Sequence, residues 1–170
     1  SWKGIQKGFY GANLVIECYK TIVRFVNSIA NVKKIYAIPG NHDRATDRKE
    51  IDSEGFVAKI IFELIRQSFK NEIDVEYDDR VISTTVDNIN YIMTHGHLKM
   101  TDINPAELIL EYGNPFRYNL LLSGHWHERR IKKDTKNFRQ LTCPSLFPGN
   151  NYSVNLGYSS QPGFIIVENN

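Results

Sequence analysis

All five histidines of this 170-residue chain lie in three short motifs, and these motifs hold the residues best suited to chemistry. They read Gly-Asn-His-Asp at residues 40–43, Thr-His-Gly-His at residues 94–97 and Gly-His-Trp-His at residues 124–127. Neutral imidazole is the commonest nitrogen ligand of first-row transition metals, and an asparagine carbonyl adds a hard oxygen. Each motif alone is compatible with a structural turn or an ordinary histidine. Together, the three motifs predict a metal site.

Each motif directly follows a short apolar run that we expect to form a β-strand, over residues 34–38, 89–94 and 118–123. Ligands bind at the carboxyl ends of strands in open α/β sheets, because the loops there are free to present side chains. Three strands that end in histidine at one edge would bring imidazoles from distant parts of the sequence together.

The rest of the chain predicts the elements that must position these motifs. Helical periodicity indicates helices over residues 13–29 and after Ser53, and a proline and a glycine bound a third helix from Pro105 to Gly113. The first two helices are expected to bury Leu14, Val15, Cys18, Ile22, Val26 and Ile29, and Phe56, Ile60, Ile61, Leu64 and Ile65, respectively. Further strands are expected over residues 73–77, 80–86 and 164–167, with a hairpin within 131–143. This order favours a layered α/β domain.

Composition excludes several classes of protein. Hydrophobic residues make up 41% of the chain and charged residues 24%, as in ordinary globular proteins. A net charge of +2 does not by itself argue for nucleic-acid binding, and no apolar run is long enough to span a membrane. Two cysteines, Cys18 and Cys143, are too few for a disulfide framework and are expected to be buried free thiols in a reducing compartment, the cytoplasm.

The order and strand context of the three motifs, from about Lys34 to His127, resemble the last three motifs of the calcineurin-like metallophosphoesterases. The resemblance implies a β-sandwich flanked by helices and a single domain over residues 1–170 that is incomplete at its N-terminus. Residues 142–146 (TCPSL) and 163–165 (GFI) resemble phage-like or DNA-repair-exonuclease-like members. The implied activity is hydrolysis of a phosphoester, as a phosphodiesterase or nuclease, at a dinuclear metal site.

The family pattern implies a role for each motif residue. Asn41, His95 and His125 would bind one metal ion and His127 the other, while His42 would donate a proton or stabilise the transition state. A further group would orient the loop or contact substrate, namely Asp43, His97 and Arg129. Two divalent ions are implied in the complete protein, with manganese the first choice and zinc, iron and magnesium as alternatives.

Two upstream motifs of the family, Asp-x-His and Gly-Asp, are missing. No histidine precedes His42, the chain holds no Gly-Asp pair, and the only acidic residue before the first motif is Glu17. The chain therefore offers three ligands to one ion and one to the other, so we expect weak or absent activity in this fragment. Loss of the first strands would also expose apolar surface and strand edges, which favours self-association.

Several alternatives remain open from the residues alone. A non-catalytic protein-binding scaffold of the same fold is the main alternative function, and a structural zinc site at His95, His125 and His127 is a third. The substrate would be nucleic acid, a small nucleotide or a phosphoprotein, in that order of preference. Basic residues over 129–133 would steer a polyanion or simply form a solvated strand face, and Trp126 would pack the wall of the site or stack on a base.

Overall fold

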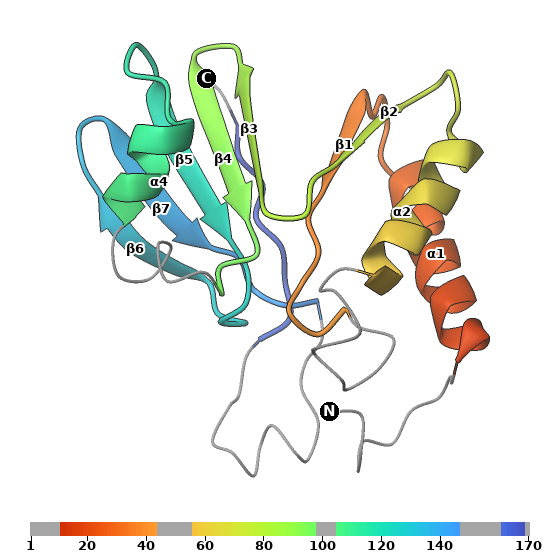
Figure 1. Cartoon of the computed structure of the whole chain (residues 1–170). Helices are drawn as coiled ribbons and strands as arrows, with labels where there is room; N and C mark the ends of the chain where they lie inside the picture. Colours follow the sequence, from red (N-terminus) through yellow and green to blue (C-terminus); the bar gives the residue numbers. More distant parts are fainter. Residues whose placement is uncertain (1–10, 44–55, 98–104, 147–160, 169–170) are drawn as a thin grey trace, which may run out of the picture. The chain divides into compact units, whose positions relative to one another are not determined.

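The computed structural model describes residues 11–43, 56–97, 105–146 and 161–168. These residues form three helices and seven strands, in one two-stranded and one five-stranded sheet (Figure 1). The α/β class expected from the sequence is confirmed, with mixed sheets flanked by helices. The chain divides into two compact units, Ser1–Arg80 and Val81–Asn170, which are described separately.

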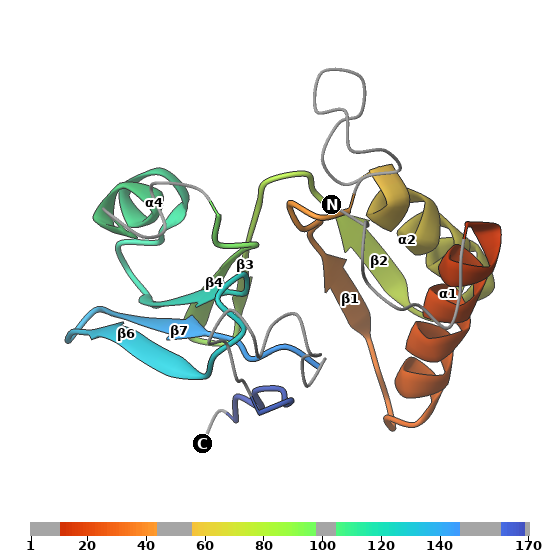
Figure 2. The ribbon, with the colours of Figure 1, turned by 90° about the horizontal axis from the view of Figure 1, so that it is seen from below.

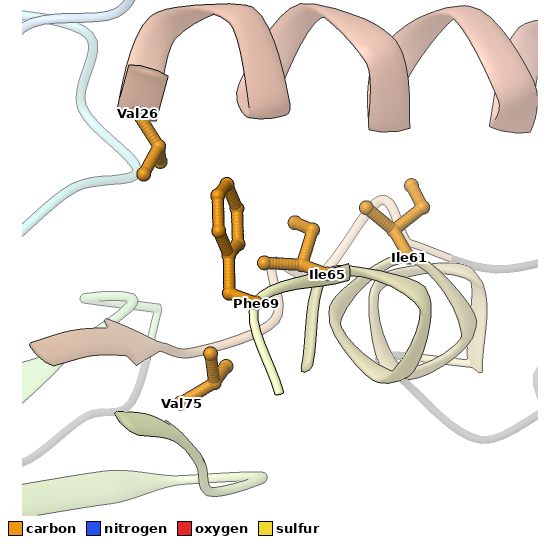
Figure 3. Close-up of a cluster of buried hydrophobic side chains, with 5 residues drawn as sticks. All are labelled: Val26, Ile61, Ile65, Phe69 and Val75. Atoms are coloured by element: carbon orange, nitrogen blue, oxygen red, sulfur yellow. The ribbon is translucent and has the colours of Figure 1, made fainter. Parts of the chain in front are cut away.

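The first unit is a pair of parallel strands with two helices packed together. Its elements are α1 (Ala12–Asn27), β1 (Lys34–Ala37), α2 (Phe56–Ser68) and β2 (Asp74–Tyr77), and β1 pairs in parallel with β2. Both helices lie on the same side of the strand pair (Figures 1 and 2). The core between them is a cluster of buried apolar side chains (Figure 3), namely Val26, Ile61, Ile65, Phe69 and Val75.

The buried face of α2 is narrower than its sequence suggests. Ile61 and Ile65 are buried as expected, and Phe69 continues their row at a spacing of four residues. Ile60 and Leu64 are 43% and 41% exposed, so their expected burial was wrong. Each residue of a helix turns by about 100°, which carries these two side chains away from the row that faces α1.

Two expectations for α1 also need correction. Cys18 is exposed rather than buried, because the side chains that pack against the core come from Val15, Tyr19, Ile22, Val23 and Val26. Ile29 lies beyond the end of the helix and is 46% exposed. Ser28 ends α1: its backbone N–H donates to the Arg24 carbonyl oxygen at 3.1 Å and its hydroxyl donates to the Phe25 carbonyl oxygen at 2.7 Å.

The second unit contains the five-stranded sheet, whose strand order is β3-β4-β5-β7-β6. Its elements are β3 (Val81–Val86), β4 (Ile89–Thr94), α4 (Pro105–Tyr112), β5 (Tyr118–Ser123), β6 (Arg130–Asp134) and β7 (Phe138–Thr142). The three inner strands β4, β5 and β7 are parallel, and the edge strands β3 and β6 pair with them antiparallel. The hairpin expected within residues 131–143 is confirmed as β6 and β7.

Helix α4 covers one face of this sheet (Figures 1 and 2). Leu108, only 1% exposed, belongs to a buried cluster with Val81, Ile92 and Leu121 of three adjacent strands. Gly113 follows the helix, and a Cβ atom there would lie 2.2 Å from the Ile109 carbonyl oxygen. Because any side chain would clash with this oxygen, the backbone conformation at the end of α4 requires glycine.

Buried amides fasten the C-terminal end of α4 to the start of the parallel strands. The Asn90 amide donates to the Tyr112 carbonyl oxygen at 3.3 Å and to Asn119 Oδ1 at 3.0 Å. Asn119 Oδ1 also accepts from the Asn114 backbone N–H at 2.8 Å. These bonds lie at the N-terminal ends of β4 and β5, whereas the histidine motifs follow the C-terminal ends of the same strands.

The C-terminal segment differs from the sequence expectation. Residues 164–167 were expected to form a strand, but the structure shows an irregular segment there. The backbone N–H of Gly163 donates to the Ser145 carbonyl oxygen at 2.9 Å, which holds the start of this segment against the chain that follows β7. In the part of the chain that the structure describes, no helix has the length and apolar character needed to cross a membrane.

Candidate metal centre

The ends of β4 and β5 bring three of the five histidines together. The two strands are parallel neighbours in which Thr94 pairs with Ser123, so the segments that carry His95 and His125 leave the sheet side by side (Figure 1). The ring centroids of His95 and His125 are 5.2 Å apart. The ring of His97 lies 5.3 Å from that of His95 and 6.2 Å from that of His125.

Backbone contacts hold the two histidine loops against each other. The Gly124 N–H donates to the His95 carbonyl oxygen at 2.9 Å. The Trp126 N–H then donates to the Gly124 carbonyl oxygen at 2.8 Å, which closes a three-residue turn around His125 at φ 68°. His127 also has a positive φ, 55°. Two non-glycine residues in this region within one short loop are uncommon, and such strain is concentrated at functional sites.

Gly96 fits between the two loops because it has no side chain. It is buried, with φ 104°. A Cβ atom at this position would lie 3.1 Å from the Gly124 carbonyl oxygen, 3.1 Å from Ser123 Cβ and 3.5 Å from His125 Cβ. Glycine at residue 96 therefore allows the close approach on which the spacing of the histidine rings depends.

The histidines differ in their exposure to solvent. His95 and His125 are half-buried, whereas His97 and His127 are exposed.

A buried row of hydroxyls, from Thr94, Ser123 and Thr142, lies at the ends of β4, β5 and β7. None of the three hydroxyl oxygens has a hydrogen-bond partner within the described residues. The sequence contained a signal for this row that was missed, since each of the three strands ends in serine or threonine.

The Gly-Asn-His-Asp motif follows β1 in the first unit. The Asp43 carboxylate accepts a hydrogen bond from the Gly40 N–H, and the Asp43 N–H donates to the Gly40 carbonyl oxygen at 3.2 Å. These bonds close residues 40–43 into a compact turn. Asn41 is half-buried and His42 is exposed. Asp43 therefore closes the loop that carries Asn41 and His42.

Both cysteines are free thiols, as expected, with environments that suppress ionisation. Cys18 is exposed as a residue, but partial desolvation of its thiol, followed by the negative charge of Asp43, raises its pKa. Burial also raises the pKa of Cys143, a half-buried residue whose N–H donates to the Ser123 carbonyl oxygen at 2.6 Å. A raised pKa keeps a thiol protonated at neutral pH, and the thiolate is the form that binds metal.

The donor chemistry of the second unit suits a transition metal, although the donor set is incomplete there. Two imidazoles that share one ion, each nitrogen about 2 Å from it, have ring centroids roughly 5 Å apart. The spacings of His95 to His125 and to His97 match this value. However, no group of three or more His, Cys, Asp or Glu side chains among the described residues is arranged to hold an ion. Two of these imidazoles could therefore bind one metal ion together, and other donors would have to complete its coordination.

One comparison with known proteins shows the family of this chain. The chain belongs to the calcineurin-like phosphoesterase superfamily, whose domain model matches residues 12–163. A search of curated proteins gave no match.

Among solved structures, the chain is similar to two crystal structures of Vps29 from Entamoeba histolytica. A single mutant of Vps29 is 13% identical with a TM-score of 0.47, over 95% of this chain and 79% of that one. A double mutant is 10% identical with a TM-score of 0.41, over 85% of this chain and 70% of that one.

Proposed function

We propose that this chain carries part of the active site of a metal-dependent phosphoester hydrolase that cleaves phosphodiesters, with nucleic acid as its substrate. The observation that carries the proposal is the meeting of His95, His97 and His125 at the ends of two adjacent parallel strands. The chain's membership of the calcineurin-like phosphoesterase superfamily supports it.

In this proposal three half-buried residues, Asn41, His95 and His125, and the exposed His127 bind metal. Asn41, His95 and His125 would hold one divalent ion and His127 a second, with manganese preferred over zinc, iron and magnesium. Such ions, when bound, would supply neutralisation of phosphate charge and a water molecule of lowered pKa. The half-buried positions of His95 and His125 suit this role, because ligands partly shielded from solvent keep a defined orientation.

The other exposed residues of the motifs would contact the substrate. His42 would donate the proton that the leaving oxygen requires, a task for which an imidazole is suited near neutral pH. Asp43 would hold the loop that presents His42, through its hydrogen bond to Gly40. His97 and Arg129 are exposed and would contact the phosphate or the chain that flanks it.

The test is hydrolysis of bis-p-nitrophenyl phosphate with added Mn²⁺. We would compare this chain with a form extended by the upstream Asp-x-His and Gly-Asp motifs, and each with its His125→Ala variant. Phe116→Ala is the matched control, because Phe116 is 91% exposed and precedes β5, whereas His125 follows it. We expect slow hydrolysis by the chain and faster hydrolysis by the extended form, with both lost on His125→Ala and kept on Phe116→Ala.

The alternative function is a protein-binding scaffold of the same fold, and it is supported by the incomplete donor set, since no group of three or more His, Cys, Asp or Glu side chains among the described residues is arranged to hold an ion. Titration calorimetry with Mn²⁺ separates the two functions. A folded, extended form that binds Mn²⁺ without hydrolysing diesters would refute the enzyme and leave the scaffold. Hydrolysis that is insensitive to His125→Ala would refute the proposed site.

A further inference from the structure

Trp126 is an exposed indole placed between two histidines of the candidate metal centre. Its side chain is 45% exposed, although tryptophan carries a large apolar surface that is highly buried on average. Its ring lies edge-on to the ring of His125, with centroids 5.3 Å apart and an interplanar angle of 79°. The indole is thus held beside His125 while solvent still reaches much of its surface.

A lysine completes this arrangement. Lys132 of β6 places its Nζ atom 4.8 Å from the centroid of the Trp126 ring. An ammonium group at this distance is attracted to the face of an indole, and the contact holds the ring in one orientation. Lys132 on one face of the indole and His125 at its edge hold the Trp126 ring in place. The ring therefore presents a fixed aromatic surface next to a positive charge.

The surrounding segment is basic. Residues 126–134 contain four cationic side chains, Arg129, Arg130, Lys132 and Lys133, against two carboxylates, Glu128 and Asp134. The carboxylates are partly engaged, since Glu128 lies 3.4 Å from Arg130 and Asp134 lies 2.7 Å from Arg139. An anionic chain approaching His125 would therefore meet a positive surface beside an aromatic one.

We propose that Trp126 and Lys132 bind one nucleotide of a single-stranded nucleic acid next to the bond that is cleaved. The base stacks on the indole and the adjoining phosphate pairs with the Lys132 ammonium group. The inference rests on the proposed phosphodiesterase function and narrows its substrate from nucleic acid in general to a single strand. A single strand is favoured over a duplex because duplex bases already stack on each other, whereas unpaired bases offer free π-faces. A phosphopeptide could pair its phosphate with Lys132, but it has no base to stack on Trp126.

Tryptophan fluorescence tests the contact directly. The chain has two tryptophans, so a Trp2→Phe form leaves Trp126 as its sole indole. We expect a single-stranded oligothymidylate of about ten nucleotides, within the range of known single-strand sites, to quench this fluorescence. Inorganic tripolyphosphate, which has charge and no base, should quench the fluorescence much less, since it can reach the indole only through Lys132. Equal quenching by both, or by neither at saturating binding, would overturn the stacking contact.

Affinity is measured by anisotropy of the fluorescein-labelled oligonucleotide. Trp126→Ala should weaken binding about 5- to 150-fold, the range found for loss of one base–aromatic stack, and Trp126→Phe should restore most of it. Lys132→Gln should reduce the slope of log K against log salt by about 0.7, the value for one phosphate of a single strand. Phe116→Ala and Lys136→Gln are matched controls that remove an exposed aromatic and an exposed cation elsewhere in the same unit.

The outcomes separate this inference from the proposed function. If bis-p-nitrophenyl phosphate is hydrolysed in a His125-dependent way but oligonucleotide binding is the same in Trp126→Ala and Phe116→Ala, the nucleotide contact is refuted and the hydrolase stands. If oligonucleotide binding depends on Trp126 while no diester is hydrolysed by the extended form, the contact stands and the hydrolase is refuted. Binding of a duplex as tight as that of the single strand would refute the substrate class.

Discussion

Replacement of Gly96 by alanine should damage both the stability of the second unit and its ability to bind metal. At φ 104° an alanine is strained, and strained residues cost about 1–3 kcal/mol. The new methyl group would also lie 3.1 Å from both the Gly124 carbonyl oxygen and Ser123 Cβ, closer than the optimum of about 3.5–4.0 Å. Overpacking of this kind costs about 1–3 kcal/mol. We expect the free energy of unfolding to fall by roughly 3 kcal/mol, a large part of the ~5–15 kcal/mol typical of a domain.

The same methyl group should alter the histidine cluster. The contacts with Gly124 and Ser123 can relax only if the two loops separate, and this would lengthen the bond from the Gly124 N–H to the His95 carbonyl oxygen. The rings of His95 and His125 would then move apart. Because loss of the groups that orient metal ligands costs about 10- to 100-fold in metal affinity, we expect a drop of that order for Mn²⁺.

Urea denaturation followed by circular dichroism measures the first effect, and titration calorimetry with Mn²⁺ measures the second. Gly11→Ala is the matched control, because Gly11 also has a positive φ, 52°, but a Cβ atom there meets nothing within 4 Å. The control isolates backbone strain from packing. A Gly96→Ala variant that loses no more stability than Gly11→Ala and binds Mn²⁺ like the unchanged chain would refute the role assigned to Gly96.

Three further predictions concern stability. Ile65→Ala should lower the free energy of unfolding by about 2–5 kcal/mol, because Ile65 is fully buried. Ile60→Ala on the same helix should cost much less, and equal losses in urea denaturation would contradict the assignment of the core. Thr142→Val should raise the free energy of unfolding by about 1 kcal/mol, because it removes a buried hydroxyl that has no partner within the described residues. Thr85→Val should lower it by about 0.5–1.5 kcal/mol, since the Thr85 hydroxyl donates to Asn90 Oδ1 at 3.1 Å, and a loss of stability in Thr142→Val would show that its hydroxyl is satisfied. Burial raises the pKa of Cys143, so the stability it contributes is fully present below the unfolded thiol's pKa of about 8.5 and is lost as the pH rises through the higher native value. The difference in unfolding free energy between the unchanged chain and Cys143→Ala should therefore be constant up to about pH 8 and decline above it, and a decline at lower pH would contradict this cause.

Local sequence patterns identified the secondary structure and the motifs with few errors. The predicted strands over residues 89–94 and 118–123 have the same bounds as β4 and β5, because short apolar runs that end at glycine or histidine motifs are local signals. The helix that ends before Gly113 was predicted from its proline and glycine for the same reason. The segment Asn104-Pro105-Ala106-Glu107 also predicts that Asn104 caps this helix, and Asn104 lies outside the described residues.

Where the sequence misled, the deciding interactions were between distant residues. The apolar stretch over residues 164–167 has the composition of a strand but forms an irregular segment, because composition does not supply a pairing partner. Ile60 and Ile65 are equally apolar, and only the position of α1 determines which of them is buried.

The sequence by itself determined that three histidine motifs follow three strands, since that order depends on neighbours along the chain. The tertiary structure decided which side chains meet. The parallel register of Thr94 with Ser123 places His97 beside both His95 and His125. The β6–β7 hairpin likewise brings Lys132 over Trp126. Strand register and ring contacts arise from long-range pairing and close packing, so the spacing of residues along the chain could not have specified them.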